Sequence, residues 1–519
     1  MEEIFRKYPI GIQSFEKLRN NNYVYVDKTS LIYKLANTNS TYFLSRPRRF
    51  GKSLLVSTLE AYFLGKKELF HGLAMETLEK EWTVYPVLHL DFSVSKYMTA
   101  DMLSAAINRQ LLQWEKLYGR EEGETTFSLR FEGIIHRAYQ QTGKQAVVLI
   151  DEYDSPMLDS NNDDEIQKEI RGILRDFFSP LKKNDSYLRF LFLTGISKFS
   201  QMSIFSELNN LQNISMRDDY SAICGITEQE LRTQLQIDIE QMAQANNETF
   251  EEACIHLKQQ YDGYHFSENC EDIYNPFSLF NAFAQKKYAN FWFSTGTPTF
   301  LIDLLQECDF DIRQLDETTA TAEQFDAPSN RITDPLPVLY QSGYLTIKGY
   351  DSDFQTYILS YPNKEVRKGF IESLMPAYVH LPARENTFYV VSFIKDLRAG
   401  KLDECLERLK SFFASIPNKL NNKEEKHYQT IFYLFFRLMG QYIDVEVDTA
   451  IGRADAVVKL PNDIYVFEFK VDGTPEEALE QINSKQYSIP YQSENRKVIK
   501  VGVNFDSTTR TIGTWKVEL

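Results

Sequence analysis

The stretch Tyr42-Phe43-Leu44-Ser45-Arg46-Pro47-Arg48-Arg49-Phe50-Gly51-Lys52-Ser53 sets the fold expected for the N-terminal part of the chain. Its first residues are apolar, and a turn then leads into a sequence that favours a helix from Lys52 to about Leu64. The end of the stretch matches G-x-x-x-x-G-K-[ST], a pattern in which backbone amides and a helix N-terminus surround phosphate oxygens. Arg46 replaces the first glycine of that pattern. The stretch therefore predicts a strand, a phosphate-binding loop and a helix.

Three further apolar runs, at 87–92, 146–150 and 190–193, alternate with amphipathic segments. Runs that are apolar on both faces are typical of parallel strands buried between helices. We therefore expect an α/β multidomain protein whose N-terminal domain is a P-loop NTPase, with a parallel sheet covered by helices on both faces.

Two acids directly follow the run at 146–150. Ligands of open α/β sheets bind beyond the carboxyl ends of the strands, so Asp151 and Glu152 are expected near the phosphate loop. Asp151 and the Ser53 hydroxyl would hold Mg²⁺, Lys52 would neutralise the β- and γ-phosphates, and Glu152 would polarise the attacking water. The alternative is a chance Gly-Lys-Ser at a helix start. The residues predicted to bind ATP are Arg46, Arg49, Gly51, Lys52, Ser53 and Asp151.

The C-terminal part of the chain changes character. A strongly apolar helix is expected at 425–439, followed by a meander of three strands and then by a helix and one more strand. The order describes a compact α/β unit with one meander of three strands. The expected strands are 444–447, 454–460, 464–471 and 498–505, and the second helix is 475–486.

A second group of charged residues lies in this unit. Strand periodicity places Glu468 and Lys470 on one face, which is otherwise apolar. Asp455 and Glu468 would chelate Mg²⁺, or Mn²⁺, and Lys470 would position or activate the water that attacks a phosphodiester. The alternative is a structural salt bridge, since a buried charge requires a partner.

Three more residues are weaker candidates for this second site. Glu425, at the start of the preceding helix, could complete the metal shell or could be an exposed helix-start acid. Gln481 and Tyr487 could contact the substrate backbone, and core or surface roles compete evenly with that role. These motifs predict three parts, namely an ATPase domain at 1–225, a mostly helical lid or middle region at 226–385 and a nuclease-like domain at 386–519.

Composition narrows the class of protein. The net charge of -16 argues against a chain coated for non-specific nucleic-acid binding, although a local basic groove stays open. No apolar run approaches the roughly 20 residues that cross a bilayer, so no membrane partner is expected. The five cysteines form no close pair or zinc pattern, which favours free thiols in a reducing cytoplasm. A homo-oligomer is left open.

With both groups of motifs quoted, the chain resembles the AAA-ATPase-like proteins of Bacteroides-type bacteria that carry a C-terminal PD-(D/E)XK nuclease domain. Within that family an arginine at the position of Arg46 is usual. The resemblance implies that Lys52, Ser53, Asp151 and Glu152 serve the nucleotide. It also implies that the C-terminal domain is a restriction-endonuclease-like α/β domain, with Asp455, Glu468 and Lys470 as its nuclease core. Ala454 replaces the proline of the nuclease family's name, as in many of its members. Further motifs that carry the resemblance are Tyr25-Val-Asp-Lys-Thr29, Thr194-Gly-Ile-Ser-Lys-Phe199, Phe205-Ser-Glu-Leu-Asn-Asn-Leu211, Tyr261-Asp-Gly-Tyr-His-Phe266, Tyr274-Asn-Pro-Phe277, Trp292-Phe-Ser-Thr-Gly-Thr-Pro298 and Gly452-Arg-Ala-Asp455.

The leading hypothesis is therefore an ATP-binding and ATP-hydrolysing protein that controls a metal-dependent nuclease, with DNA favoured over RNA as substrate. The alternative is a nucleotide-dependent switch that binds nucleic acid or a protein partner without cleaving it. The intact set of Asp455, Glu468 and Lys470 favours cleavage, because a site without a function has no reason to keep a buried lysine beside two acids.

Overall fold

The structure is a computed structural model, and the chain forms two compact units. The first comprises Met1–Ser294 and Thr318–Glu365, and the second comprises Thr295–Glu317 and Val366–Leu519. The expected middle region, 226–385, is thus shared between them. The structure describes residues 6–160, 163–196, 211–295, 299–325, 334–379, 383–416, 425–440, 444–447, 455–491 and 496–519.

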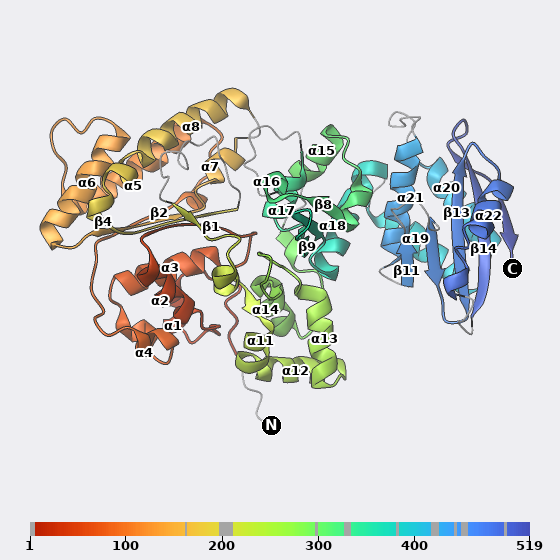
Figure 1. Cartoon of the computed structure of the whole chain (residues 1–519), viewed down its shortest axis with the longest axis horizontal. Helices are drawn as coiled ribbons and strands as arrows, with labels where there is room; N and C mark the ends of the chain where they lie inside the picture. The colour runs from red at the N-terminus through yellow and green to blue at the C-terminus, as the bar shows by residue number, and fades with distance from the viewer. Residues whose placement is uncertain are drawn as a thin grey trace. The chain divides into compact units, whose positions relative to one another are not determined.

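The first unit is built on a parallel sheet of five strands in the order β2-β3-β4-β1-β5. The prediction of a parallel sheet covered on both faces is confirmed, because helices α1–α4 lie on one face and α5–α8 on the other (Figure 1). The strand order adds that β4 separates β1 from β3. The strands are β1 (Thr41–Ser45), β2 (Val87–Asp91), β3 (Ala146–Asp151), β4 (Leu188–Gly195) and β5 (Gln212–Asn213).

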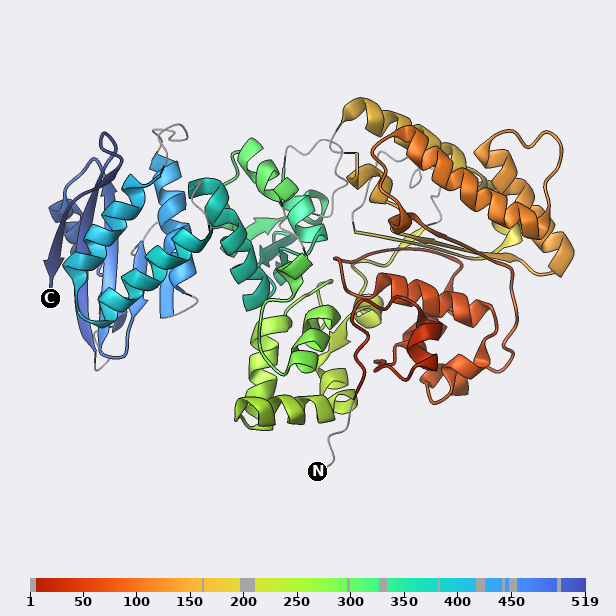
Figure 2. The ribbon, with the colours of Figure 1, turned by 180° about the vertical axis from the view of Figure 1, so that it is seen from behind.

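Amphipathic helices bury their apolar faces on this sheet. In α5, Leu103, Ile107 and Leu111 follow a spacing of four residues and pack in the core with β3 and α8. The view from behind shows the same layers (Figure 2). The helices are α1 (Phe15–Asn20), α2 (Thr29–Thr38), α3 (Lys52–Phe63), α4 (Ala74–Leu78), α5 (Ala100–Tyr118), α6 (Phe127–Thr142), α7 (Ser155–Leu158), α8 (Asp164–Phe178) and α9 (Pro180–Lys183).

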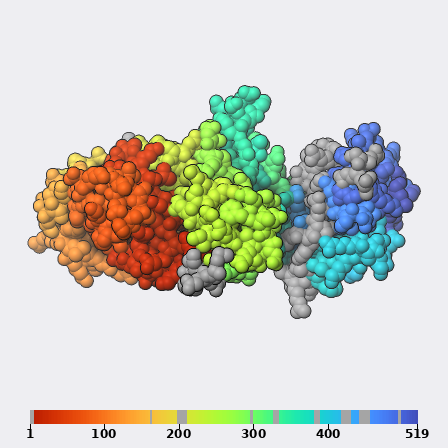
Figure 3. Space-filling model, turned by 90° about the horizontal axis from the view of Figure 1, so that it is seen from below, coloured from red at the N-terminus to blue at the C-terminus, as the bar shows by residue number. Residues whose placement is uncertain are grey.

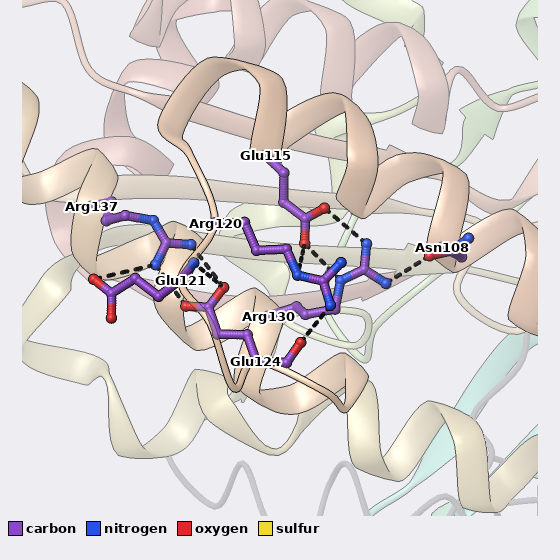
Figure 4. Close-up of polar contacts among 7 residues, drawn as sticks. All are labelled: Asn108, Glu115, Arg120, Glu121, Glu124, Arg130 and Arg137. Atoms are coloured by element: carbon purple, nitrogen blue, oxygen red, sulfur yellow. Dashed lines mark hydrogen bonds and ion pairs between the residues drawn. The ribbon is translucent and has the colours of Figure 1, made fainter.

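Ion pairs connect α5 to α6 and to the loop between them (Figure 4). The buried Arg130 guanidinium donates to both oxygens of Glu115, at 2.6 and 3.0 Å, and to Asn108 at 2.6 Å. Arg137 donates to both oxygens of Glu124 at 2.6 and 3.0 Å. Buried charges with paired hydrogen bonds of this kind fix the geometry of the helix pair and require no catalytic explanation.

The rest of the first unit is a helical segment followed by a small antiparallel sheet. Val24 and Val26 pack against Ile226 and the helices that follow it, so two segments far apart in the sequence share a core. On the face drawn in Figure 3, the N-terminal part of the chain (red) lies beside this helical segment (yellow-green). The sequence predicted mostly helices here, with a short helix end and a strand over 340–348. That strand corresponds to β9, and the sequence analysis did not predict β8 and β10 of the sheet β8-β10-β9. The elements are β6 (Ile226–Thr227), α11 (Glu228–Gln234), α12 (Gln236–Asn246), α13 (Phe250–Tyr261), β7 (Ile273–Tyr274), α14 (Pro276–Gln285), β8 (Thr318–Ala320), α16 (Ala322–Phe325), α17 (Leu336–Gln341), β9 (Thr346–Asp351) and β10 (Thr356–Ser360).

A buried acid follows α13 and makes the stability of this unit depend on pH. Burial raises the pKa of Asp262 to about 7, against smaller opposing effects of the Gly263 amide and Lys258. A carboxyl whose pKa is raised on folding stabilises the folded state while protonated, and that contribution is lost as pH rises from about 4 to about 7. We expect Asp262→Asn to exceed the wild type in unfolding free energy by about 2 kcal/mol at pH 8 and to lose this advantage at pH 4. Urea unfolding at both pH values measures the difference, and an equal effect at both would contradict the assignment.

The second unit contains a mixed sheet in the order β11-β12-β13-β14-β15. The predicted antiparallel meander β11-β12-β13 is confirmed, and β14 runs parallel to β13 after the crossover through α22. The sequence did not predict β15, which pairs antiparallel with β14 at the edge. The elements are α15 (Thr299–Glu307), α18 (Lys364–Val379), α19 (Ala383–Arg398), α20 (Leu402–Ala414), α21 (Glu425–Met439), β11 (Asp444–Val447), β12 (Ala456–Lys459), β13 (Asp463–Val471), α22 (Pro475–Ser484), β14 (Lys497–Asp506) and β15 (Thr511–Glu518). None of the described helices has the length and apolar character that a membrane crossing requires.

Candidate nucleotide and metal sites

The loop between β1 and α3 has the features of an anion site. Helix α3 begins without a side-chain cap, and the amides of residues 50–54 donate to no acceptor in the described part of the chain. Gly51 has φ +95°, and the space where a Cβ would stand is open. Free amides at a helix N-terminus attract negative charge, so the loop can hold phosphate oxygens as the sequence pattern predicts.

Lys52 connects the loop with the acids of β3. Its buried Nζ donates to the carbonyl oxygens of Arg46 at 3.0 Å and Pro47 at 3.4 Å, and lies 3.3 Å from Glu152 Oε1. Glu152 adopts φ +51°, in the left-handed region that is uncommon for residues other than glycine. The structure thus brings the predicted residues of the two motifs together, although β4 lies between their strands.

Asp151 lies at the buried end of β3 and accepts hydrogen bonds from two hydroxyls. Thr194 Oγ1, at the end of β4, donates to Asp151 Oδ1, and the Ser53 side chain also bonds to this carboxyl. Burial raises the pKa of Asp151, and both hydroxyls oppose that rise. Ser53 and Asp151 offer hard oxygen ligands side by side, so the donor set fits Mg²⁺. The sequence analysis quoted Thr194 only as the first residue of a motif. The structure adds that its hydroxyl bonds to the Asp151 carboxylate.

Arg46 is placed differently from the prediction that it contacts the nucleotide. Its guanidinium is 2% exposed and donates to the carbonyl oxygens of Ser45, Ser215, Tyr220 and Ser221 at 2.7–3.4 Å. It also lies 4.1 Å from the centre of the Phe266 ring. Because these contacts occupy the guanidinium, we assign Arg46 to the support of the loop rather than to the phosphates.

This assignment predicts a loss of stability when Arg46 is removed. Arg46→Met fills a similar volume but leaves four buried carbonyl oxygens without the guanidinium, and hydrogen bonds from charged donors are each worth more than neutral ones. We expect the free energy of unfolding of the first unit to fall by about 3 kcal/mol. Denaturant unfolding measures this loss, with the exposed Arg48→Met as the matched control. An unchanged midpoint would contradict the structural role.

Arg49, also predicted to bind the nucleotide, contacts the backbone of a distant segment in this structure. Its Nη1 donates to the carbonyl oxygens of Trp292 at 2.9 Å and Phe291 at 3.4 Å, and its guanidinium lies 4.1 Å from the centre of the Phe277 ring. Partial burial lowers the pKa of Arg49, and Glu365 opposes that effect. The structure therefore connects Arg49 with residues far along the chain.

An apolar cavity beside the loop was missed by the sequence analysis. It is mostly apolar and borders Gly51, the residue at the start of α3. Ligand cavities are commonly lined by apolar side chains and orient the ligand with few polar contacts. Residues from four separate segments line the cavity, among them Val26, Phe50, Gly51, Ile223, Ile226 and Phe280.

The second group of predicted residues meets on the strand β13. Lys470 Nζ donates to Glu468 Oε1 at 3.1 Å and to Gln481 Oε1 at 2.5 Å, and Gln481 Nε2 donates to the Tyr487 hydroxyl at 3.2 Å. Asp455 precedes β12 and accepts a hydrogen bond of 2.8 Å from the Phe469 amide. The structure thus groups Asp455, Glu468 and Lys470 and adds Gln481 as the second acceptor for the lysine.

Glu468 is a buried acid whose pKa is raised. Its residue is 2% exposed, and its Oε2 has no hydrogen-bond partner in the described part of the chain. Burial raises its pKa to about 7 with a further contribution from Asp455, and Lys470 opposes the rise. A buried carboxylate oxygen without a partner, beside a second carboxylate, fits a hard divalent cation. Glu425 begins α21 as predicted, but its side chain lies outside the described residues. Residues 197–199, 205–210, 296–298 and 452–454 of the quoted motifs also lie outside them. No cluster of three or more metal-ligating side chains occurs within the described ranges.

Comparison with known proteins finds family matches in two separate parts of the chain. Residues 9–205 match the family described as predicted AAA-ATPase, and residues 423–515 match the PD-(D/E)XK nuclease superfamily. The chain is also similar to an uncharacterized protein encoded in the vnfD 5′ region of Azotobacter chroococcum mcd 1, with 35% identity over 525 residues that cover 99% of both chains. The chain therefore belongs to the family of proteins that combine an N-terminal predicted AAA-ATPase domain with a C-terminal domain of the PD-(D/E)XK nuclease superfamily.

Proposed function

We propose that the protein is an ATP-dependent regulator of its own nuclease domain, which hydrolyses phosphodiester bonds of nucleic acid, with DNA favoured as the substrate. The observation that carries the proposal is the buried carboxylate of Glu468. Its Oε2 has no hydrogen-bond partner among the described residues, a second acid is its neighbour, and Lys470 bonds to its other oxygen. A salt bridge kept only for stability would satisfy both carboxylate oxygens, because an unsatisfied buried oxygen costs free energy.

At the nucleotide site, Lys52 would exchange its loop carbonyls for the β- and γ-phosphates, and Ser53 with Asp151 would hold Mg²⁺. Glu152, 3.3 Å from Lys52 Nζ, would orient and polarise the attacking water. The amides of residues 50–54 would bind phosphate oxygens, and the apolar cavity beside Gly51 supports a place for the base.

At the nuclease site, Asp455 and Glu468 would hold Mg²⁺ or Mn²⁺. Such an ion supplies electrostatic stabilisation of the charge that develops on the phosphodiester. Lys470 would donate a hydrogen bond toward the scissile phosphate or the attacking water, and Gln481 and Glu468 would hold its ammonium in place. The contact from Tyr487 through Gln481 to Lys470 supports a preorganised lysine.

The test is a cleavage assay with the purified full chain on single- and double-stranded DNA and RNA. Mg²⁺ and Mn²⁺ are compared with chelator, each with and without ATP. We expect cleavage that requires the metal and changes in rate when ATP is added. An absence of cleavage under every condition, with ATP turnover intact, would overturn the proposal and favour the non-cleaving switch.

A further inference from the structure

Two of the three passages between the compact units begin at one place in the first unit. The chain enters the second unit after Ser294 and again after Glu365. Glu365 is 1% exposed, and its Oε1 accepts hydrogen bonds from the amides of Phe291 at 2.5 Å and Trp292 at 2.9 Å. Glu365, the last residue before one passage, therefore holds the backbone of Phe291 and Trp292, which precedes the other passage. We call Glu365 and residues 291–294 the connection.

The phosphate loop holds the same two residues through their carbonyl groups. Arg49 donates to the carbonyl oxygens of Phe291 and Trp292, whose amides bond to Glu365. Arg49 stands two residues before Gly51 and adopts φ +69°. This conformation is uncommon for arginine, so the loop carries backbone strain at the residue that reaches the connection.

A second contact ties the loop to the segment before Glu365. A Cβ at Gly343 would stand 2.7 Å from Pro47 Cβ, so this glycine permits close approach of the loop. The next residue, Tyr344, packs edge-on against Trp292 with ring centres 5.0 Å apart. The phosphate loop therefore also contacts the connection through Pro47, Gly343 and Tyr344, without the Arg49 guanidinium.

We propose that Arg49 and Glu365 form a coupling element through which nucleotide bound at the phosphate loop orders the two chain passages to the nuclease-bearing unit. The inference rests on the proposed nucleotide site. When phosphate oxygens bind the amides of residues 50–54, the loop backbone is held in one conformation, and Arg49 with it. The backbone of Phe291 and Trp292 then samples fewer conformations than it does beside a loop without nucleotide. A ligand can shift the connection only through such differential contacts.

The electrostatics agree with this geometry. Burial raises the pKa of Glu365 to about 7, and the amides of Phe291 and Trp292 and the charge of Arg49 oppose that rise. Glu365 and Arg49 therefore act on the same stretch of backbone, and the peptide group that joins Phe291 to Trp292 is bonded to both side chains.

The experiment is amide hydrogen exchange of the full chain with and without the non-hydrolysable analogue AMP-PNP and Mg²⁺. In the wild type we expect nucleotide to slow exchange about fivefold in peptides that cover residues 288–295 and 364–370. Glu365→Met, which has no acceptor for the two amides, and Arg49→Met should each lose this protection. Glu365→Met should still bind the nucleotide within about twofold of the wild-type Kd, since its side chain lies outside the phosphate loop. Glu115→Gln, a buried and ion-paired glutamate on α5, is the matched control and should retain the protection.

The outcomes separate this inference from the proposed function. If the wild type binds no AMP-PNP in a direct titration, the nucleotide site and the coupling fail together. If it binds the analogue but the two peptides show no protection, only the coupling fails. Protection that persists in both variants would also overturn the coupling role of these residues. Arg49→Lys should lose part of the protection, because a lysine cannot stack on Phe277 and bond two carbonyls with a planar group.

Discussion

Replacement of Lys470 by alanine is expected to lower metal-dependent cleavage of nucleic acid by about 100-fold or more, the usual scale for a group that positions or transfers a proton. Lys470 Nζ contacts Glu468 and Gln481, so its charge is held at one point beside the predicted metal ligands. Loss of that charge removes stabilisation of the transition state and leaves the nucleotide site intact. Initial rates on a labelled DNA duplex with Mn²⁺ measure the effect, and ATP turnover of the variant should match the wild type.

A second lysine of the same sheet provides the control. Lys500 lies on β14, where its Nζ donates to Asn483 Oδ1 and Glu518 Oε1, each at 2.7 Å. Lys500→Ala removes an equal charge from the neighbouring strand and should keep cleavage within about twofold of the wild type. Equal cleavage by Lys470→Ala and the wild type would mean that this site does not cleave, and equal losses in both variants would indicate a general loss of charge or fold.

Lys52→Ala is expected to lower ATP hydrolysis by about 100-fold or more and to weaken nucleotide binding, because Lys52 is the buried cation of the phosphate loop. In the structure its ammonium is held by two loop carbonyls and Glu152, which are the contacts that phosphates would replace. Phosphate release measures hydrolysis, and titration with a fluorescent ATP analogue measures binding.

The same variant reports on control of the nuclease site. Cleavage by Lys52→Ala should no longer change with added ATP. Comparison of its rate with the wild-type rates with and without ATP shows whether ATP activates or restrains cleavage. Lys66→Ala serves as the control, since Lys66 forms a surface ion pair with Glu16 that contributes little. ATP turnover by Lys52→Ala at the wild-type rate would contradict the assignment of this loop.

Much of the fold was predictable because local patterns carry it. The apolar runs at 87–92, 146–150 and 190–193 are the strands β2, β3 and β4, and the change from period two to helical spacing located α22. The antiparallel edge strand β15 was missed because its alternation of small, polar and aromatic residues gives a weak signal.

The candidate site was predictable where position along the chain implies position in space. Gly51, Lys52 and Ser53 follow a strand and begin a helix, so their place at a helix N-terminus is local information. Glu468 and Lys470 share a face because strand side chains alternate. The direction of the Arg46 side chain was not predictable, since it depends on Ser215, Tyr220 and Phe266, which are distant in sequence.

The sequence by itself therefore determined the class of each domain and the residue types of both sites, because those depend on spacing within single strands, turns and helices. Only the tertiary structure decided that β4 separates β1 from β3, that Arg46 supports the loop, and that Arg49 bonds to Phe291 and Trp292. These features depend on contacts between segments hundreds of residues apart, and the free energy of such contacts comes from shared burial and hydrogen bonding rather than from local preference. Local preference is the part of folding that a pattern in one stretch of sequence can express.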